Sequence, residues 1–378
     1  MKPYSLDIQA PVATLPILWA KLPDFPVQGN YEWDSGLAGT IAGAHGPWIM
    51  IAGGANFTKS FPWKGGTKHY HDSIYLLNTA ANEHAVWKQA EQKLSKPLAY
   101  SAVVESSDGI IVLGGETPDG LSAAVQRLSF DNGIPVFENL PNLPNPVAAA
   151  SAVIIDQTLF VIGGTRDNEY SNEVLSLSLA PGISKWEHLT SLPNKITHAV
   201  AVAQFDGIET CLYLLGGRNK NSNIHSFSSQ IWKFSPSTDQ WTLSGQLMHG
   251  RQPISLSAGT GVAFGNNAIL MIGGDPGILF NQTERINLQL EAAAGIENTT
   301  ELLALKHQLL TSHPGFSRDI LIFNTHSNSC GCLETVNFDL PVSSRAFSLG
   351  NRWILPPGEI RPGCRSSEVR TFTIKQHE

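Results

Sequence analysis

Residues 48–54 read WIMIAGG, an apolar run that ends in two glycines, and its recurrence decides the fold. The same pattern returns as IIVLGG at 110–115, LFVIGG at 159–164, LYLLGG at 212–217 and ILMIGG at 269–274, with a degenerate WILPPG at 353–358. Successive final glycines are 61, 49, 53, 57 and 84 residues apart. A period near ~50 residues indicates an array of small structural repeats. The chain is therefore predicted to contain six copies of one unit.

The residues around each copy predict a unit of four strands. A strand of small residues precedes the apolar run, and an alternating strand and then a strand that contains tryptophan follow it. Examples are SAVVE at 101–105, EVLSLSL at 173–179, and the tryptophans Trp87, Trp186 and Trp241. Four strands per repeat form a blade of a β-propeller, and a period of ~50 residues is that of Kelch repeats. We therefore expect an all-β, six-bladed Kelch-type β-propeller that occupies residues 1–378 as a single domain.

The last unit lacks its outer tryptophan strand, and the start of the chain supplies one. After WILPP the sequence continues to SEVRTFTI at 367–374 and then stops, whereas PILWAKLPDFP near the N-terminus contains Trp19. We expect residues 16–22 to pair with residues 368–374 and so to close the ring. Closure removes the exposed sheet edges that would invite aggregation.

One long interval contains a helical insertion. Residues 283–312 are predicted to form one or two helices, because Leu302, Leu305 and Leu309 recur at helical spacing. The insertion could pack on one face of the propeller. It could equally form a lid over the central pocket, since insertions in repeat proteins often lie on the binding face.

Composition and charge narrow the classes of partner. The 34 glycines and 23 prolines, with only 15% charged residues, suit short strands joined by tight turns. The formal net charge is −7 without a basic cluster, which argues against a nucleic-acid partner. No apolar run has the length of a membrane span. The four cysteines predict no disulfide framework, and Cys330-Gly-Cys332 lacks the C-x-x-C spacing of redox or zinc motifs.

The N-terminus gives no sign of a signal peptide. Asp7 and Pro11 interrupt any apolar segment there. The compartment stays open between the cytoplasm and the periplasm, because a leader could have been trimmed from a periplasmic protein.

The loops after the Gly-Gly runs converge at one end of a propeller and are the expected place for a pocket. The polar residues that follow these runs are Asn56, Glu116, Arg166, Arg218, Asp275 and Glu359. By this position, Asn56, Arg166 and Arg218 are candidate substrate-binding residues. The alternative interpretation, which position alone favours for most of these residues, is an ordinary turn or inter-blade polar residue.

The sixth unit carries the most distinctive loop, PGEIRPGCR at 357–365. Pro362-Gly363 is a turn signal, so the loop should fold back and bring Arg365 near Glu359. A nearby guanidinium favours the ionised carboxylate and keeps it available as a base. Arg365 could instead anchor an anionic substrate, and a structural salt bridge is the third interpretation.

Three stretches resemble the cyclically permuted mutarotase family, relatives of the bacterial sialic-acid mutarotases. They are GLAGTIAGAHGPWIMIAGGANF at 36–57, ILMIGGDPGILFNQTERIN at 269–287, and WILPPGEIRPGCRSSEV at 353–369, which matches the pattern G-E-x-[KR]-P-G-x-R. In the unpermuted relatives, the first stretch lies near the C-terminal end. Pro356-Pro357 departs from the family, where a less constrained strand end is usual.

The resemblance implies an isomerase that interconverts the anomers of an acidic sugar, above all N-acetylneuraminate. Glu359 matches the proposed proton acceptor, and Arg365 matches the arginine that assists it. Arg361 occupies the basic position between them and is a further candidate substrate-binding residue, which could pair with the sugar carboxylate together with Arg365. The implied partner is a small sugar acid, and neither a cofactor nor a metal is expected. His69 and His71 would share a strand face, but nothing nearby completes a metal site. The alternatives are a mutarotase for another sugar and a non-catalytic Kelch interaction module.

Overall fold

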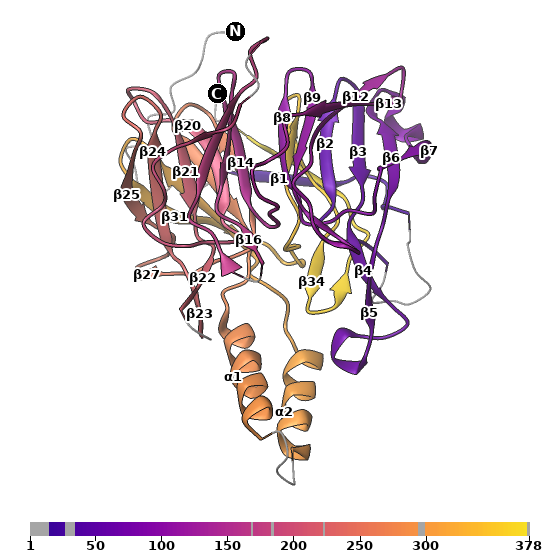
Figure 1. The fold of residues 1–378 in the computed structure, drawn as a ribbon, viewed down its shortest axis with the longest axis vertical. Coiled ribbons are helices and arrows are strands. Elements are labelled where there is room, and N and C mark those ends of the chain that lie inside the picture. The colour runs from indigo at the N-terminus through magenta and orange to yellow at the C-terminus, as the bar shows by residue number, and fades with distance from the viewer. Residues whose placement is uncertain are drawn as a thin grey trace.

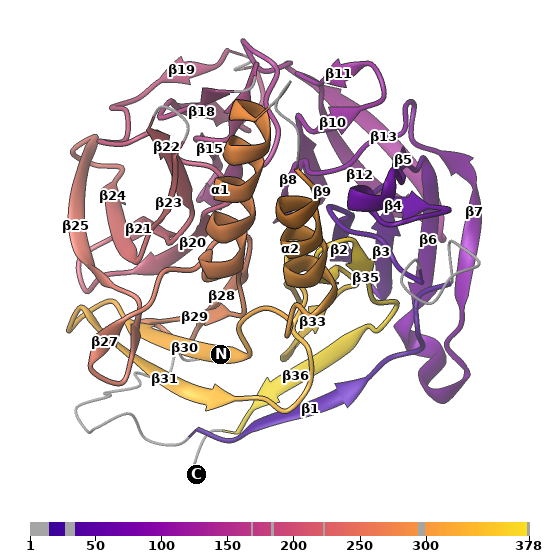
Figure 2. The same ribbon diagram turned by 90° about the horizontal axis from the view of Figure 1, so that it is seen from below.

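Six four-stranded antiparallel sheets surround a central axis in the computed structural model, within the residues that it describes (Figure 2). These residues are 15–26, 35–167, 169–182, 185–221, 224–293 and 299–375. The expectation of an all-β, six-bladed propeller is confirmed. Asp7 and Pro11, on which the signal-peptide prediction rests, lie outside the described residues.

Each blade runs from an inner strand at the axis to an outer strand at the rim. From inside to outside, the first blade contains β2 (Ile41–His45), β3 (Trp48–Ala52), β6 (Ser73–Asn78) and β7 (Trp87–Lys93), and the second contains β8 (Ala102–Ser106), β9 (Gly109–Leu113), β12 (Val125–Asp131) and β13 (Ile134–Leu140). The third contains β14 (Ser151–Ile155), β15 (Thr158–Ile162), β18 (Val174–Ser178) and β19 (Glu187–His188), and the fourth contains β20 (Val200–Phe205), β21 (Thr210–Leu215), β24 (Gln230–Ser235) and β25 (Gln240–Gln246). The fifth contains β28 (Thr260–Phe264), β29 (Ala268–Ile272), β30 (Asp319–Asn324) and β31 (Ser329–Thr335), and the sixth contains β32 (Phe347–Leu349), β33 (Arg352–Leu355), β36 (Arg370–Ile374) and β1 (Ile17–Lys21).

The predicted closure of the ring is confirmed. Strand β1 forms the outer strand of the sixth blade and pairs antiparallel with β36, from Ile17 opposite Ile374 to Lys21 opposite Arg370. The indole of Trp19 packs on the ring of Phe372, with centroids 4.8 Å apart. The first segment of the chain therefore completes the blade that the last segment begins.

The paired glycines let neighbouring blades approach closely. Gly53 has a φ of 59°, and a Cβ added to it would lie 2.3 Å from the carbonyl oxygen of Leu98 in the next blade. The N–H of Gly54 donates to that same oxygen at 2.8 Å. A side chain at Gly53 would push the blades apart, and a Cβ at Gly54 would lie 2.7 Å from the Thr40 side chain of its own blade. These two close approaches are the physical reason for the recurring Gly-Gly.

A ring of backbone hydrogen bonds lines the axis. One residue before the inner strand of each blade, two positions before it in five blades and four in the sixth, has a left-handed φ between 50° and 64°. Each of their N–H groups donates to the carbonyl of another ring member at 2.7–3.1 Å. The six members are Gly39, Tyr100, Ala149, His198, Ala258 and Ser343. Five of the six are not glycine, so the ring fixes them in a left-handed backbone conformation that residues with a side chain rarely adopt. We call these six residues the axial ring.

Tryptophans in or next to the outer strands connect neighbouring blades. The indole N–H of Trp87 donates to the carbonyl of Pro23 at 2.8 Å, that of Trp186 to Pro141 at 2.9 Å, and that of Trp241 to Thr190 at 2.9 Å. The recurring tryptophan therefore adds a polar contact at the rim to the apolar packing between the sheets.

Short hairpins follow the second strand of five blades and lie on one face of the ring (Figure 1). They are β4 (Ala55–Thr58) with β5 (Thr67–Tyr70), β10 (Glu116–Thr117) with β11 (Gly120–Leu121), β16 (Thr165–Arg166) with β17 (Glu169–Tyr170), β22 (Arg218–Asn221) with β23 (Ile224–Phe227), and β34 (Glu359–Arg361) with β35 (Cys364–Arg365). The remaining short elements are β26 (Met248–His249), β27 (Gln252–Pro253) and the 3-10 turns at Pro62–Lys64 and Thr79–His84.

Two helices replace this hairpin in the fifth blade. Helix α1 (Ile278–Ala292) and helix α2 (Thr300–Thr311) project from the hairpin face and lie near the axis (Figures 1 and 2). The predicted helical insertion at 283–312 is confirmed, although α1 begins five residues earlier. Among the described residues, no helix is long and apolar enough to cross a membrane.

Candidate active site

A cavity of about 430 Å³ opens on the hairpin face, at the axis of the ring. Its walls come from the starts of the hairpins, from the axial ring, and from one side of each helix. Phe280, Thr283 and Glu284 of α1 and Leu309 and Leu310 of α2 contribute to it. The helical insertion therefore forms part of the cavity wall rather than packing only on the outside of a blade.

Six equivalent positions follow the glycine turns. The first residue after each turn forms an isolated β-bridge to the segment before its own inner strand. These residues are Ala55, Glu116, Thr165, Arg218, Asp275 and Glu359. Four of them carry charged side chains, and all four of these line the cavity. The repeat thus places three carboxylates and one guanidinium at matching positions around one space.

Three of the predicted substrate-binding residues lie outside the cavity lining. Asn56 and Arg166 come one position later than the bridge residue of their blades, so their side chains point to the other side of the strand. Asn56 is fully buried, and its Oδ1 accepts a hydrogen bond from His71 Nε2 at 2.9 Å. Arg166 forms an ion pair with Glu173, and Arg361 forms one with Asp339 at 3.5 Å.

Glu359 and Arg365 lie opposite each other in the hairpin of the sixth blade. Gly363, with a φ of 72°, folds the loop back as Pro362-Gly363 predicts, and its N–H donates to Glu359 Oε1 at 2.7 Å. Arg365 Nη2 lies 3.5 Å from Glu359 Oε2. Both contacts fix the position of the Glu359 carboxyl group in the hairpin.

Arg365 and Glu359 differ in how deeply their side chains are buried. The Arg365 side chain is 2% exposed and packs its guanidinium 4.7 Å from the centroid of the Phe57 ring, whereas that of Glu359 is 18% exposed. Glu359 lines the cavity and Arg365 does not. A molecule in the cavity would therefore meet the carboxylate, with the guanidinium behind it.

Another wall is built around Lys68, which sequence reasoning missed. Its Nζ lies 2.5 Å from Glu116 Oε2, an atom that also accepts from the Tyr70 hydroxyl at 3.0 Å. Lys68 Nζ also lies 4.6 Å from the centroid of the Tyr100 ring. Burial lowers the pKa of Lys68, but the charges of Tyr100 and Glu116 outweigh it and raise that pKa. Lys68 and Glu116 thus largely neutralise each other.

Arg218 is the guanidinium of the cavity that stands apart from the carboxylates. Among the described residues, none places a carboxylate oxygen within 4.0 Å of it. Its Nε is buried without a hydrogen-bond partner, and its guanidinium carbon lies 4.9 Å from the centroid of the Phe280 ring on α1. Burial raises the pKa of Tyr170, and the charge of the neighbouring Arg218 opposes that rise.

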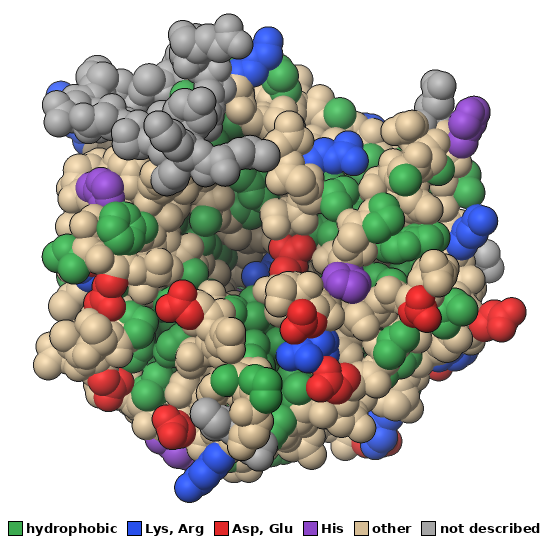
Figure 3. All heavy atoms as spheres, turned by 90° about the horizontal axis from the view of Figure 1, so that it is seen from above, with side chains coloured by type: hydrophobic (Ala, Val, Ile, Leu, Met, Phe, Trp, Pro, Cys, Tyr) green, Lys and Arg blue, Asp and Glu red, His purple; other side chains and the backbone are tan. Residues whose placement is uncertain are grey.

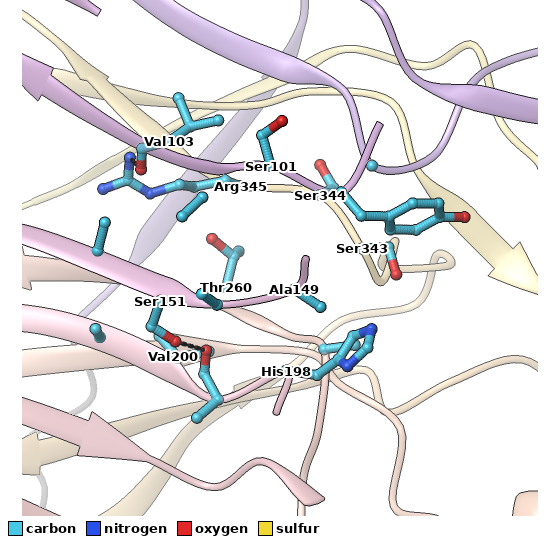
Figure 4. A pocket seen from close by; sticks show the side chains of 18 of the residues that line it. Ser101, Val103, Ala149, Ser151, His198, Val200, Thr260, Ser343, Ser344 and Arg345 are labelled. Carbon is cyan, nitrogen blue, oxygen red and sulfur yellow. Dashed lines mark hydrogen bonds between the residues drawn. The ribbon is translucent and has the colours of Figure 1, made fainter. Parts of the chain in front are cut away.

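A narrow channel continues from the cavity through the axial ring. Its volume is about 130 Å³, and Figure 4 shows His198 and Ser343 at one end and Arg345 beside Val103 at the other. Arg345 Nη1 donates to the carbonyl of Val103. Beyond Arg345, a second hollow of about 220 Å³ leads to the opposite face, which is hollowed near its centre (Figure 3). The side chain of Arg345 therefore separates the two ends of the axis.

Possible metal ligands lie away from the cavity. Among the described residues, His249, Asp319 and Cys332 bring ligand atoms within 4.8 Å of one another on the outside of the fifth blade. His249 Nδ1 and Asp319 Oδ2 are already 2.8 Å apart. The rings of His69 and His71 are 4.7 Å apart, and burial, followed by the charge of His69, lowers the pKa of His71 to about 4.

The fold and the site together define the class of protein, which is a six-bladed propeller with an acidic, partly apolar cavity at its axis. A family model described as the KLHDC2/KLHL20/DRC7 Kelch-repeats domain matches residues 39–274, more than half of the chain. The chain belongs to the Kelch-repeat family.

Comparison with individual curated proteins finds relatives that share one name. A segment of 111 residues is 36% identical to the N-acetylneuraminate epimerase of Brucella suis, over 27% of each chain. A segment of 125 residues is 34% identical to that of Yersinia enterocolitica, over 30% of each chain. The matches thus span less than a third of these curated relatives, which carry the name that the sequence resemblance predicts.

A solved structure of YjhT matches 94% of this chain and 99% of its own, with a TM-score of 0.61. The sequence identity is 13%, so this likeness concerns the fold.

Proposed function

We propose that the protein is a mutarotase that interconverts the anomers of an acidic sugar of the N-acetylneuraminate class. The observation that carries the proposal is Glu359, a carboxylate that faces the axial cavity and is held by the buried Arg365 and the Gly363 N–H. The names of the matched relatives support the substrate class.

Glu359 would act as the general base. It would take the proton of the anomeric hydroxyl while the bond from the anomeric carbon to the ring oxygen breaks. The open-chain carbonyl would then rotate about one carbon–carbon bond and reclose on its other face. Positioned proton transfer of this kind is worth ~10²–10⁴-fold, enough to matter for a reaction that already proceeds in water.

Arg365 would hold Glu359 in position as the base, and would not bind the substrate itself. Its burial behind Glu359 supports this division, because a guanidinium that is 2% exposed has little surface to offer a ligand. It is a positioning residue in this proposal.

Arg218 would bind the carboxylate of the sugar. It faces the same cavity without a carboxylate partner among the described residues, and the ring of Phe280 covers part of its guanidinium. A guanidinium matches a carboxylate in two parallel hydrogen bonds and keeps its charge when water is excluded. This arrangement favours an acidic sugar over a neutral one.

The proposal is tested by proton NMR of freshly dissolved α-N-acetylneuraminic acid with catalytic amounts of protein. Faster relaxation to the β-anomer than in buffer is expected. The methyl ester of the same sugar should relax more slowly with the protein than the acid does. Arg218→Met should raise KM for the acid by about 10–100-fold, the worth of a hydrogen bond between charged groups, and leave the ester little changed. Unchanged relaxation of the acid with wild-type protein would refute the proposed function.

A further inference from the structure

A second carboxylate of the cavity occupies the position in the fifth blade that Glu359 occupies in the sixth. Asp275 and Glu359 are each the first residue after the glycine turn, and each bridges back to its own blade, to Ser257 and Val342 respectively. Both side chains line the cavity. Adjacent blades therefore present two carboxylates to the same bound molecule.

The contacts of the two carboxylates differ. Glu359 receives the Gly363 N–H and a guanidinium. Asp275 receives the N–H of Gly277 at Oδ1, at 2.8 Å, and among the described residues no cation lies within ion-pair distance of it. Glu359 thus has a guanidinium and an N–H as partners, whereas Asp275 keeps an oxygen, Oδ2, that can carry a proton.

The reaction of the proposed function needs a proton donor as well as a base. When the ring opens, the electron pair of the breaking bond goes to the ring oxygen, which must be protonated to leave as a hydroxyl. The donor has to approach from beside the base, because the ring oxygen and the anomeric hydroxyl share one carbon. Neighbouring blades satisfy that requirement.

We propose that Asp275 is the general acid that protonates the ring oxygen while Glu359 deprotonates the anomeric hydroxyl. After the bond rotation the roles reverse. The Asp275 carboxylate takes the proton of the attacking hydroxyl, and protonated Glu359 gives its proton to the carbonyl oxygen. Both residues return to their starting states, and no other reactant is consumed. The inference rests on the proposed function and adds the donor that it lacks.

The electrostatic surroundings of Asp275 agree with this role. Burial raises the pKa of the Asp275 carboxyl, and the charge of Glu359 raises it further, against the opposing effects of the Gly277 N–H and Arg218. The other titratable groups of the cavity are Lys68, Tyr100, Glu116, His198, Glu284 and His313. The two carboxyl groups differ in their partners, because Glu359 faces a guanidinium and Asp275 does not. Two carboxyl groups in different environments can divide the roles of base and acid between them.

The sign of the pH dependence follows. A general acid is active only while protonated, so the catalysed rate should fall as the pH rises through the pKa of Asp275. A bound sugar carboxylate would raise that pKa further, because it adds a like charge.

The test is anomer relaxation by NMR between pH 4 and 9, after subtraction of the protein-free rate. Asp275→Asn keeps an oxygen for the Gly277 N–H but has no carboxylic proton. It should lower kcat by about 10²–10³-fold, leave KM within about threefold, and abolish the fall in rate at high pH. Asp275→Glu should restore part of the rate together with that fall. Asp72→Asn, which removes a carboxylate paired with Lys93 outside the cavity, is the control for the loss of one charge.

The outcomes separate the two proposals. If wild-type protein accelerates relaxation and Asp275→Asn keeps both its rate and its pH profile, Asp275 is not the acid, and the proposed function stands. A merely structural role would appear as a lower melting temperature with an unchanged profile, and that result would also overturn the inference. If wild-type protein does not accelerate relaxation, both proposals fail together.

Discussion

At the scale of single residues, position within a strand decides what a side chain can reach. Glu359 is the first residue after its turn and faces the cavity, whereas Asn56 and Arg166 are each second and do not. Neighbouring residues of a strand point to opposite faces, so an error of one position moves a side chain out of the site. The sequence alone could indicate which loops line the cavity, but not which of two neighbouring residues in a loop faces it.

The approach of Arg365 to Glu359 was predictable, because Pro362-Gly363 encodes the turn that joins them. Its burial was not, since that depends on Phe57 from the first blade. Lys68 gave no signal in the sequence, because its place in the cavity depends on how the first hairpin leans toward Glu116 and Tyr100.

Replacement of Arg365 tests whether it positions Glu359 or binds substrate. Arg365→Met should lower kcat strongly and leave KM within about threefold, because the guanidinium lies behind the carboxylate. The loss of a charged hydrogen bond should also reduce the free energy of unfolding by about 1–3 kcal/mol, measured by urea denaturation. A tenfold rise in KM with kcat preserved would instead make Arg365 a substrate ligand.

At the scale of elements, the helical pair is where the fifth blade differs from the others. The leucine spacing predicted helices, but their place relative to the cavity stayed open. In the structure α1 packs on α2 and touches the propeller at β23, while both helices line the cavity. The position of the helices against the cavity depends on tertiary packing, which the local spacing of leucines does not encode.

Excision of the helices separates their role in binding from their role in stability. Residues 278–311 replaced by a short Gly-Ser turn would give the fifth blade a connection more like those of its neighbours. We expect the propeller to stay folded, with a melting temperature by circular dichroism within about 5 °C of wild type, because the helices contribute little to the blade cores. KM for the acidic sugar should rise at least about tenfold, since Phe280 and Leu309 no longer enclose the cavity. An unfolded product would show that the helices belong to the core.

At the scale of the whole molecule, two systems close the ring. Strand β1 completes the sixth blade at the rim, and the axial ring joins the blades at the centre. The first was predictable, because the repeat count left one tryptophan strand missing at one end and spare at the other. The second was not, because its left-handed residues include Tyr100, His198 and Ser343, which rarely adopt that conformation.

The rim closure can be tested on two neighbouring residues of β1. Trp19→Ala removes the contacts with Phe372 and with Phe338, whose ring centroid lies 5.2 Å away. It should lower the free energy of unfolding by about 3 kcal/mol, the low end for such a change, because Trp19 is only partly buried. Leu18 lies on the opposite side of the same strand and is 47% exposed, so Leu18→Ala is the matched control. It should lower the free energy of unfolding by less than about 0.5 kcal/mol. Equal effects of the two changes would contradict closure through the Trp19 face.

We propose that a carboxylate at the axis of this propeller opens a sugar ring, and one NMR assay decides whether it does. Freshly dissolved α-N-acetylneuraminic acid should relax to the β-anomer faster with wild-type protein. Glu359→Gln, an isosteric change, should lose about 10²–10³-fold of that acceleration while the protein stays folded at the assay temperature, as circular dichroism would show. Glu116→Gln changes the equivalent position of the second blade, where Lys68 and Tyr70 hold the carboxylate, and should lose much less. A Glu359→Gln protein as active as wild type would contradict the account.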